Sequence, residues 1–305
     1  MPPEGAKDLA REDLARGLWL RGLTRSAWAP TIAAMVCFAS NSLLCRLALR
    51  SGAIDAVSFT AVRLVSAAVV MTLLVRLGDQ TRAHGGSWTS AVALFAYAIA
   101  FSIAYLQIGA GIGALLLFGA VQITMIGWAL LRGERPGTVQ WIGIVLAVVG
   151  LVLLTRPGIS ESPLLGMALM LVAGVGWGIY SLRGRGSTNP LETTAANFIR
   201  TLPLVAIMVL ISVAIEPGHL TARGVALSVA SGGVTSGIGY VIWYRALAKL
   251  TAVQAASVQL TVPVLAAAGG VALLGEQVTL RLLAAAALTL GGIALTIVRR
   301  TPAAR

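Results

Sequence analysis

Two arginines, Arg63 and Arg200, lie inside long apolar runs of this 305-residue sequence. A guanidinium carries five N–H donors and stays charged in proteins, so an arginine in an apolar segment must find acceptors there. Each could be a structural tether that binds carbonyl groups at the end of a helix. Each could equally be a functional group, gating a path or attracting the carboxylate of a bound molecule. The sequence favours neither interpretation over the other.

Polar and aromatic side chains recur within the same apolar runs. An apolar environment forces each polar group to find a partner or a water-filled cavity, and aromatic rings can line a site for apolar molecules. Taken singly, each such residue is more often an ordinary contact between helices. Taken together they are candidate substrate-binding residues that would enclose a central path, and we predict this role for Asn41, Tyr97, Phe101, Phe118, Trp177, Tyr180, Trp243, Gln254 and Gln259.

The acidic residues and histidines stay outside these runs. All 11 Asp and Glu residues and both His residues fall in predicted tails, loops or span ends. Proton-coupled carriers need a titratable group inside the membrane, and metal-dependent enzymes need clustered carboxylates or histidines. The two cysteines, Cys37 and Cys45, share one apolar run, which is not the pattern of a disulfide framework. We therefore expect no catalytic residue, no cofactor and no metal.

The composition predicts the elements that position these side chains. Charged residues make up 11% of the chain and hydrophobic ones 57%, with a mean hydropathy of +0.87, whereas soluble domains carry about 25% charged residues. Because about 20 apolar residues cross the hydrocarbon as a helix, we predict an all-α polytopic membrane protein. Its ten spans are 28–47, 56–77, 88–106, 109–131, 137–155, 163–182, 191–215, 222–247, 251–274 and 279–298. Spans five and ten hold few polar residues, so we expect them at the periphery.

The basic residues predict how these spans are oriented. The formal net charge is +12, but the basic residues are scattered between apolar runs, which argues against nucleic acid as a partner and for topology markers. The polar segment 1–27 lacks the apolar core of a signal peptide. With this segment in the cytoplasm, 16 Lys and Arg residues fall inside, five fall outside, and Arg63 and Arg200 lie within spans. We therefore predict a multi-pass protein of a bacterial inner (plasma) membrane, with cytoplasmic tails at 1–27 and 299–305.

A weak internal repeat divides the chain into two halves. Three patterns recur in the same order at nearly one offset: Gly133-Glu134 as Gly275-Glu276 (142 residues), Phe38-Ala39-Ser40-Asn41 as Trp177-Gly178-Ile179-Tyr180 (139), and Asp55 with Arg63 as Glu192 with Arg200 (137). The predicted repeats are 28–155 and 163–298, joined by an external linker at 156–162. Each holds five spans, an odd number, so the second is expected to be inverted relative to the first, an arrangement that serves alternating access.

In these features the chain resembles the EamA family of the drug/metabolite transporter superfamily, over roughly residues 28–298. The five-plus-five spans, the matching residues of spans one and six, and the paired Gly-Glu turns carry the resemblance. Among family members the chain is similar to amino-acid exporters of the YddG type, which implies export. In one departure, Val121 stands where the resemblance implies a proline equivalent to Pro263. We assign the Gly-Glu turns a structural role, because a glutamate before a helix stabilises its positive end.

We therefore expect a membrane transporter, not an enzyme, that exports small metabolites, amino acids and related compounds foremost, by alternating access through a central cavity. Its partners are a small-molecule solute and the lipid bilayer, and the sequence leaves its oligomeric state open. One alternative is an organic-anion, nucleotide-sugar or drug exchanger of the same fold that uses the basic residues. A second is a membrane-embedded enzyme, which would turn over its substrate in detergent without two compartments.

The absence of acidic residues from the predicted spans generates a prediction about coupling. We expect transport to follow the solute gradient alone, because no buried carboxylate is available to carry a proton. Initial rates of solute counterflow in proteoliposomes should stay within about twofold when an imposed pH gradient is added or removed. Uptake that collapses on addition of an uncoupler would contradict this expectation.

Overall fold

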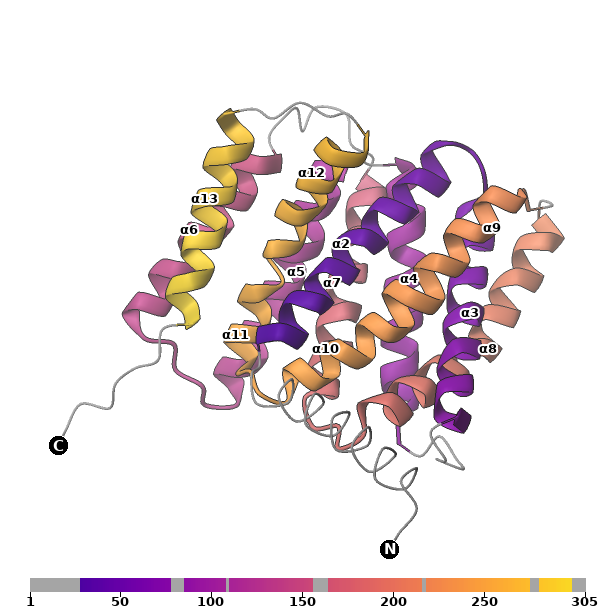
Figure 1. Ribbon diagram of the computed structural model, residues 1–305, viewed down its shortest axis with the longest axis horizontal. Coiled ribbons are helices and arrows are strands. Elements are labelled where there is room, and N and C mark those ends of the chain that lie inside the picture. Colours follow the sequence, from indigo (N-terminus) through magenta and orange to yellow (C-terminus); the bar gives the residue numbers. More distant parts are fainter. Residues whose placement is uncertain are drawn as a thin grey trace, which may run out of the picture.

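The computed structural model describes residues 28–77, 85–107, 110–155, 164–215, 218–274 and 280–297, which form a bundle of helices (Figure 1). The first half of the chain contributes α2 (Trp28–Arg50), α3 (Ala56–Leu77), α4 (Trp88–Gln107), α5 (Ala110–Leu131) and α6 (Thr138–Thr155). The second half contributes α7 (Leu164–Gly184), α8 (Pro190–Ile215), α9 (Ala222–Val229), the π-helix η2 (Ala230–Ile238), α10 (Gly239–Leu247), α11 (Ala252–Val258), α12 (Thr261–Leu274) and α13 (Leu280–Ile297).

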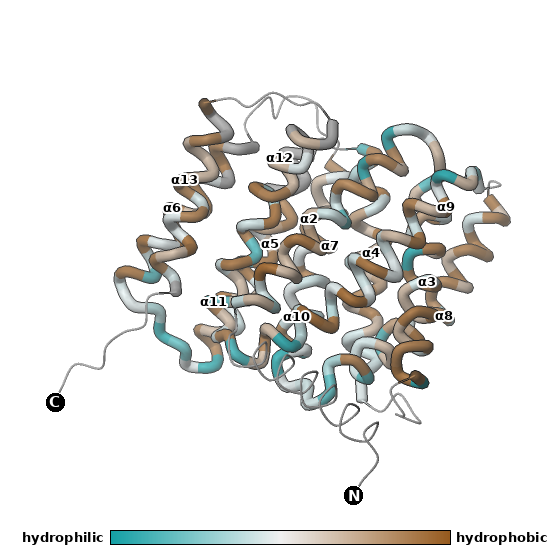
Figure 2. Tube along the Cα trace, in the orientation of Figure 1, coloured by the Kyte–Doolittle hydropathy of each residue, from teal (hydrophilic) through white to brown (hydrophobic). Residues whose placement is uncertain are grey.

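These helices have the length and composition of membrane spans. Within the described ranges, seven are long and apolar enough to cross a bilayer, and they are α2, α3, α4, α7, α8, the continuous helix Ala222–Leu247 and the segment Ala252–Gly269. Shorter apolar stretches lie in α5, α6 and α13. Apolar residues cover the helices along their lengths, and hydrophilic residues gather at their ends (Figure 2). The prediction of an all-helical polytopic membrane protein is confirmed, while the count of ten spans stays a prediction.

The outward faces of the helices carry many exposed, large apolar side chains. Leu77, Ile123 and Leu210 are each more than 70% exposed, and water would not tolerate so many apolar side chains on a folded surface. Lipid tails tolerate them, because the hydrocarbon is itself apolar. The buried polar groups then need partners inside the protein, since lipid offers none.

The two halves of the chain interleave. Helices α3 and α4 of the first half pack against α8 and α7 of the second, and α2 packs against α10, η2 and α12. The centre of the bundle is therefore built from both halves. As expected from their lack of polar residues, α6 and α13 pair with each other at one edge, the left edge of Figure 1.

Two helices depart from regular α geometry, both in the second half. The continuous helix Ala222–Leu247 widens into the π-helix η2 along a stretch that contains three glycines. The predicted span 251–274 is interrupted at Gln259 and Leu260, between α11 and α12. Proline does not interrupt α8, because Pro203 lies inside it and Pro190 is its first residue. Pro is tolerated at the first helical position because its missing N–H has no intrahelical partner there.

Glycine allows α6 and α13 to approach closely. A Cβ atom on Gly292 would lie 2.5 Å from the carbonyl oxygen of Gly143 and 2.5 Å from the backbone nitrogen of Ala147. The neighbouring Gly291 has nothing within 4 Å of such a Cβ. Adjacent glycines of one helix thus differ in whether they have room for a methyl group.

This difference predicts opposite effects of two alanine substitutions. Gly292→Ala should push α13 away from α6 and lower the free energy of unfolding by about 1–3 kcal/mol, as overpacking does. Gly291→Ala should be neutral or slightly stabilising, because alanine favours helix more than glycine. Thermal unfolding of the purified protein in detergent measures both. Equal melting temperatures for the two variants would show that the helices do not meet at Gly292.

Candidate functional site

A cavity of about 20 Å³ lies at the centre of the bundle, between helices of both halves. Its lining residues are Phe38, Asn41, Ser42, Tyr97, Phe101, Leu117, Phe118, Trp177, Tyr240 and Val262. This set includes Asn41, Tyr97, Phe101, Phe118 and Trp177 of the residues predicted from the sequence. The volume has room for about one water molecule, so a larger solute can enter only after the surrounding helices move apart.

Aromatic rings form most of the cavity wall and contact one another across it. The Trp177 ring on α7 lies 5.0 Å from that of Phe38 on α2, 5.1 Å from that of Tyr97 on α4 and 4.7 Å from that of Tyr240 on α10, measured between centroids. These separations are typical of favourable edge and tilted contacts, which add about 0.5–1.5 kcal/mol each beyond area burial. The Trp177 ring therefore joins α7 to rings from three other helices, α2, α4 and α10.

Arg63 lies behind this wall and is 1% exposed. Its Nε donates to Ser236 Oγ on η2 at 3.0 Å, and its Nη2 donates to the hydroxyls of Tyr97 at 3.3 Å and Tyr240 at 2.8 Å. Its guanidinium carbon also lies 5.3 Å from the Tyr97 ring centroid and 5.9 Å from that of Phe101. One side chain thus joins α3 to α4, η2 and α10.

The positive charge of Arg63 has no acidic partner among the residues that the structure describes. The ion pair recorded there joins Arg185 to Glu134, at the end of the bundle. The Nη1 atom of Arg63 is buried without a hydrogen-bond acceptor. We predicted that Arg63 would mark a mouth of the path. The structure instead places its guanidinium beside the central cavity, because the side chain extends inward from α3.

The π-helix η2 faces Asn41 and Arg63 at once. Ser231 and Thr235, one turn apart, direct their hydroxyls to Asn41 Oδ1 at 2.6 and 3.4 Å, while Ser236 accepts from Arg63. A Cβ atom on Gly232 would lie 2.0 Å from the Arg63 carbonyl oxygen, so this glycine lets η2 pack directly on α3. The Gly-rich sequence therefore brings a polar helix surface against both candidate residues.

Three other predicted residues support the wall from behind. Gln259, at the break between α11 and α12, accepts a hydrogen bond from Trp177 Nε1 and donates to Ala255 O. Trp243 donates to Ser181 Oγ and contacts the Phe38 ring by its edge. The Tyr180 ring stacks on Trp177. All three are buried, and they position lining rings without lining the cavity themselves.

Gln254 and Arg200 do not line the cavity, and the substrate-binding and gating roles predicted for them stay predictions. Gln254 forms a capping box with Thr251 at the start of α11, with its side-chain oxygen accepting from the Thr251 N–H at 3.1 Å. Arg200 donates to the carbonyls of Gly85 at 3.0 Å and Ala196 at 3.1 Å. The Gln254 side chain pairs a backbone N–H at the start of α11, where unpaired N–H groups are concentrated, and Arg200 binds a carbonyl of its own helix and one of the chain before α4. The tether interpretation therefore describes Arg200.

At one end of the bundle the loops after α2 and α8 pair with each other. The backbone N–H of His219 donates to Asp55 Oδ2 at 2.9 Å, and the Asp55 N–H donates to the His219 carbonyl at 2.9 Å. Ile54 and Leu220 form an isolated antiparallel bridge, and Thr221 N–H donates to Ala53 O at 2.9 Å. A short two-chain pairing thus joins the halves at this end.

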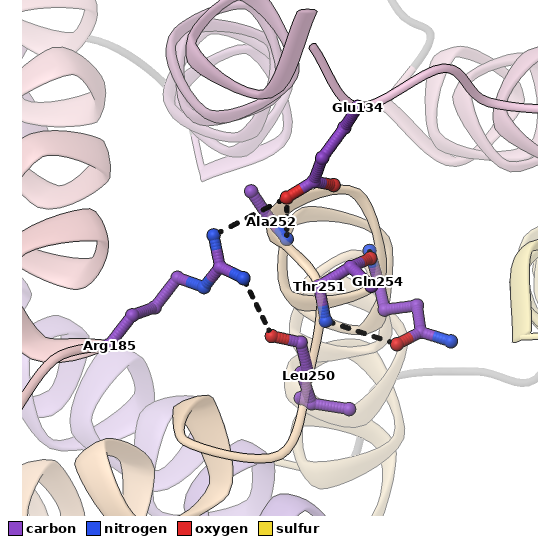
Figure 3. Close-up of polar contacts among 6 residues, drawn as sticks. All are labelled: Glu134, Arg185, Leu250, Thr251, Ala252 and Gln254. Carbon is purple, nitrogen blue, oxygen red and sulfur yellow. Dashed lines mark hydrogen bonds and ion pairs between the residues drawn. The ribbon is translucent and has the colours of Figure 1, made fainter. Parts of the chain in front are cut away.

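At the opposite end, Glu134 joins the halves (Figure 3). Its Oε1 accepts from the Ala252 N–H at 3.2 Å and from Arg185 at 3.5 Å, and Arg185 also donates to the Leu250 carbonyl at 3.1 Å. Gly133 has a φ of +83° and ends α5 with a hydrogen bond from Glu134 N to Ala129 O at 2.9 Å. This Schellman turn aims the carboxylate at the first turn of α11.

The structural role predicted for Glu134 therefore falls on a different helix. We expected it to stabilise the start of the span that follows it, but it binds the positive end of α11 in the other half. The counterpart turn, Gly275-Glu276, lies outside the described residues.

Sequence reasoning missed Tyr240 as a lining residue, and it left Phe38, Ser42, Leu117 and Val262 out of the predicted set. Tyr240 follows the glycine-rich stretch, where a π-helix shifts the register, so α-helical spacing does not indicate its direction. The structure identifies it instead by its contact, because Ser236 and Tyr240 both accept hydrogen bonds from Arg63.

Comparison with known proteins places this geometry in a family. The model of the EamA-like transporter family matches residues 27–156 and again residues 164–298. The chain belongs to the EamA-like transporter family. Two separate matches correspond to the two interleaved halves, each of which contributes rings to the cavity wall.

Curated relatives of this chain include two whose descriptions name transport. An uncharacterised protein of Pseudomonas aeruginosa is 52% identical over 274 residues, which cover 88% of this chain and 94% of that one. An uncharacterised transporter of Archaeoglobus fulgidus is 25% identical over 80% of this chain and 89% of its own. A probable amino-acid metabolite efflux pump of Salmonella typhimurium is 26% identical over 63% of this chain and 70% of its own. A solved crystal structure shares the fold, with a TM-score of 0.70 and 20% identity over 87% of this chain and 96% of that one.

The hydrogen bonds between Asp55 and His219 predict that the stability of the fold depends on pH. Burial tends to raise the pKa of Asp55, but hydrogen bonds from Ser58 and His219 outweigh it, so the pKa lies below its ordinary value. A carboxylate of this kind stabilises the fold above its unfolded pKa of about 3.9, and the stabilisation is lost as the pH falls through the folded pKa. Asp55→Asn should therefore lower the melting temperature at pH 7.

The difference between wild type and Asp55→Asn should shrink as the pH is lowered from about 5 to about 3. Melting curves of both proteins in detergent, recorded across this range, measure it. A difference that grows on acidification would contradict the role of the charged carboxylate.

Proposed function

We propose that this EamA-family protein exports small metabolites, amino acids and related compounds foremost, by alternating access through the central cavity and without proton coupling. The observation that carries the proposal is a small aromatic cavity between the two halves, with polar groups of Asn41 and Ser42 in its wall. Small-solute sites have this mixed character, with apolar walls and a few polar groups that orient the ligand. The description of the Salmonella relative agrees with such a solute class.

The contacts at the two ends support an alternating mechanism. Both ends are held by bonds between halves, through Asp55 with His219 at one and Glu134 with Ala252 at the other. These are a few hydrogen bonds on partly exposed loops, each worth about 1 kcal/mol net. Breaking one set while keeping the other would open the cavity to one side only. A transporter requires this, because a cavity open to both sides at once would let solutes leak through the membrane.

The proposed topology has ten spans in two inverted repeats, 28–155 and 163–298, with both termini in the cytoplasm of a bacterial cell. The bias of basic residues supports this orientation, and the separate family matches support two repeats. The Glu134 end would then face the cytoplasm, and the Asp55 end would face outward.

An organic-anion or drug exchanger of the same fold is the second candidate, and the uncompensated charge of Arg63 favours an anionic solute. The two candidates differ in the size and charge of the solute they move. A screen in proteoliposomes with labelled amino acids, sugar phosphates and cationic drugs separates them, because counterflow requires recognition on both sides of a sealed membrane.

We expect counterflow of apolar amino acids and a strong effect of the central tryptophan. Trp177→Ala should lower the initial rate at least about tenfold, because it removes the ring that contacts three other aromatic rings of the cavity wall. Trp141→Ala is the matched control, since Trp141 lies on α6 and is 42% exposed, and it should retain the wild-type rate. Equal rates for the two variants, or turnover that proceeds in detergent without vesicles, would overturn the proposal.

A further inference from the structure

The hydroxyl groups of Tyr97 and Tyr240 share one donor, which lies behind the wall of the cavity. Arg63 Nη2 donates to the Tyr97 hydroxyl at 3.3 Å and to the Tyr240 hydroxyl at 2.8 Å. Both tyrosines line the cavity. The two hydroxyls are therefore neighbours, held together by the same guanidinium nitrogen.

The direction of these bonds fixes what the hydroxyls can offer to a solute. A guanidinium has no acceptor, so Arg63 must donate, and each tyrosine oxygen accepts. Each phenol keeps one O–H hydrogen that Arg63 cannot accept, and the Tyr240 hydroxyl also lies within hydrogen-bond reach of Ser236 and Tyr97. Hydrogen bonds in a chain polarise one another, so donation from a charged guanidinium makes each phenol a stronger donor. Two such donors side by side match the two oxygens of a carboxylate.

The charge of Arg63 favours the same kind of ligand. The described residues provide no carboxylate for it, and its Nη1 atom is buried without an acceptor. Its guanidinium lies one aromatic layer behind the cavity, 5.3 Å from the Tyr97 ring centroid. In a medium of low dielectric constant an uncompensated charge acts strongly over such distances. The cavity is therefore a place of positive potential, although its wall is apolar.

Ser42 offers the complementary group. It lines the cavity, and its hydroxyl donates to the Phe38 carbonyl at 3.3 Å. Because its hydrogen is used in that bond, its oxygen is left to accept. An ammonium group, which only donates, is a suitable partner for this oxygen.

We propose that Tyr97 and Tyr240, held by Arg63, form an anion subsite that binds the carboxylate of the solute, with its apolar body against Phe118 and Trp177. This inference rests on the proposed function and specifies its substrate class as carboxylates with an apolar body, α-amino acids among them. Tyr97 and Tyr240 contact the solute directly. Arg63 acts through them as a positioning residue.

The test measures equilibrium binding of labelled L-phenylalanine to the purified full-length protein in detergent. Competition by L-phenylalaninamide, 3-phenylpropionate and phenethylamine separates the carboxylate from the rest of the molecule. We expect both acids to compete at least about tenfold more tightly than the amide and the amine, as a hydrogen-bonded charged group implies.

Substitutions that remove one hydroxyl each make the test specific. Tyr97→Phe and Tyr240→Phe should each weaken binding of the acids about tenfold and leave binding of the amide within about twofold. Tyr244→Phe is the matched control, because Tyr244 is buried on the same helix as Tyr240, does not line the cavity and donates to Tyr180 O. Arg63→Gln should lower the preference for acids, and Arg63→Lys should restore part of it.

The outcomes distinguish this subsite from the proposed function. Acids and amides that bind equally to the wild type, or phenylalanine variants that keep the preference, would overturn the subsite, even if proteoliposomes transport the solute. A preference for acids that is lost in Tyr97→Phe and Tyr240→Phe supports the subsite, even if sealed vesicles show no transport. In that second case the export function fails and the binding site stands. Absence of saturable binding by any of the carboxylates also overturns the subsite.

Discussion

The arrangement of the central helices depends on the need to accommodate one buried charge. The Arg63 guanidinium is enclosed by protein in a bundle whose outer surface faces lipid, so its hydrogen bonds must come from other helices. Tyr97, Ser236 and Tyr240 supply them from α4, η2 and α10. Those partners position two rings of the cavity wall, and Trp177 packs on both. Removing the charge would therefore disturb the wall as well as the electrostatic potential inside it.

Contacts between the two halves are made at both ends of the bundle. The pairing of Ile54 with Leu220 and the binding of Glu134 to the start of α11 both join the first half of the chain to the second. The interleaved packing of the halves means that neither can swing away as a rigid body without breaking lateral contacts such as those of α4 with α7. Bending within helices would leave such lateral contacts intact. The π-helix and the break between α11 and α12 lie beside the cavity, where bending would change its width.

The sequence predicted the helices well, because each span must bury its backbone in hydrocarbon and so needs a long apolar run. It also predicted that Asn41, Tyr97 and Trp177 would come together, since polar and aromatic residues in spans favour a shared interior. It could not indicate which candidates line the cavity and which stand behind it. Trp177 lines the cavity, and Gln259 accepts a hydrogen bond from it without lining the cavity. The position of Gln259 depends on the break between α11 and α12, which the spacing of residues does not predict. Gln254 was misplaced because a capping residue and a pore residue can have the same sequence context.

Arg63 and Arg200 show why matching positions in the two halves need not share a role. Each lies eight residues after an acidic residue near the start of its helix. Around Arg63, η2 places Ser236 and Tyr240 within bonding distance, and the side chain extends to the centre. Arg200 instead lies beside the chain that precedes α4, and its guanidinium donates a hydrogen bond to the Gly85 carbonyl there. The difference arises from the neighbours of each arginine, not from the repeat. One arginine of the pair therefore lies beside the cavity and the other does not, so the surroundings of the cavity are asymmetric although the two halves match in sequence.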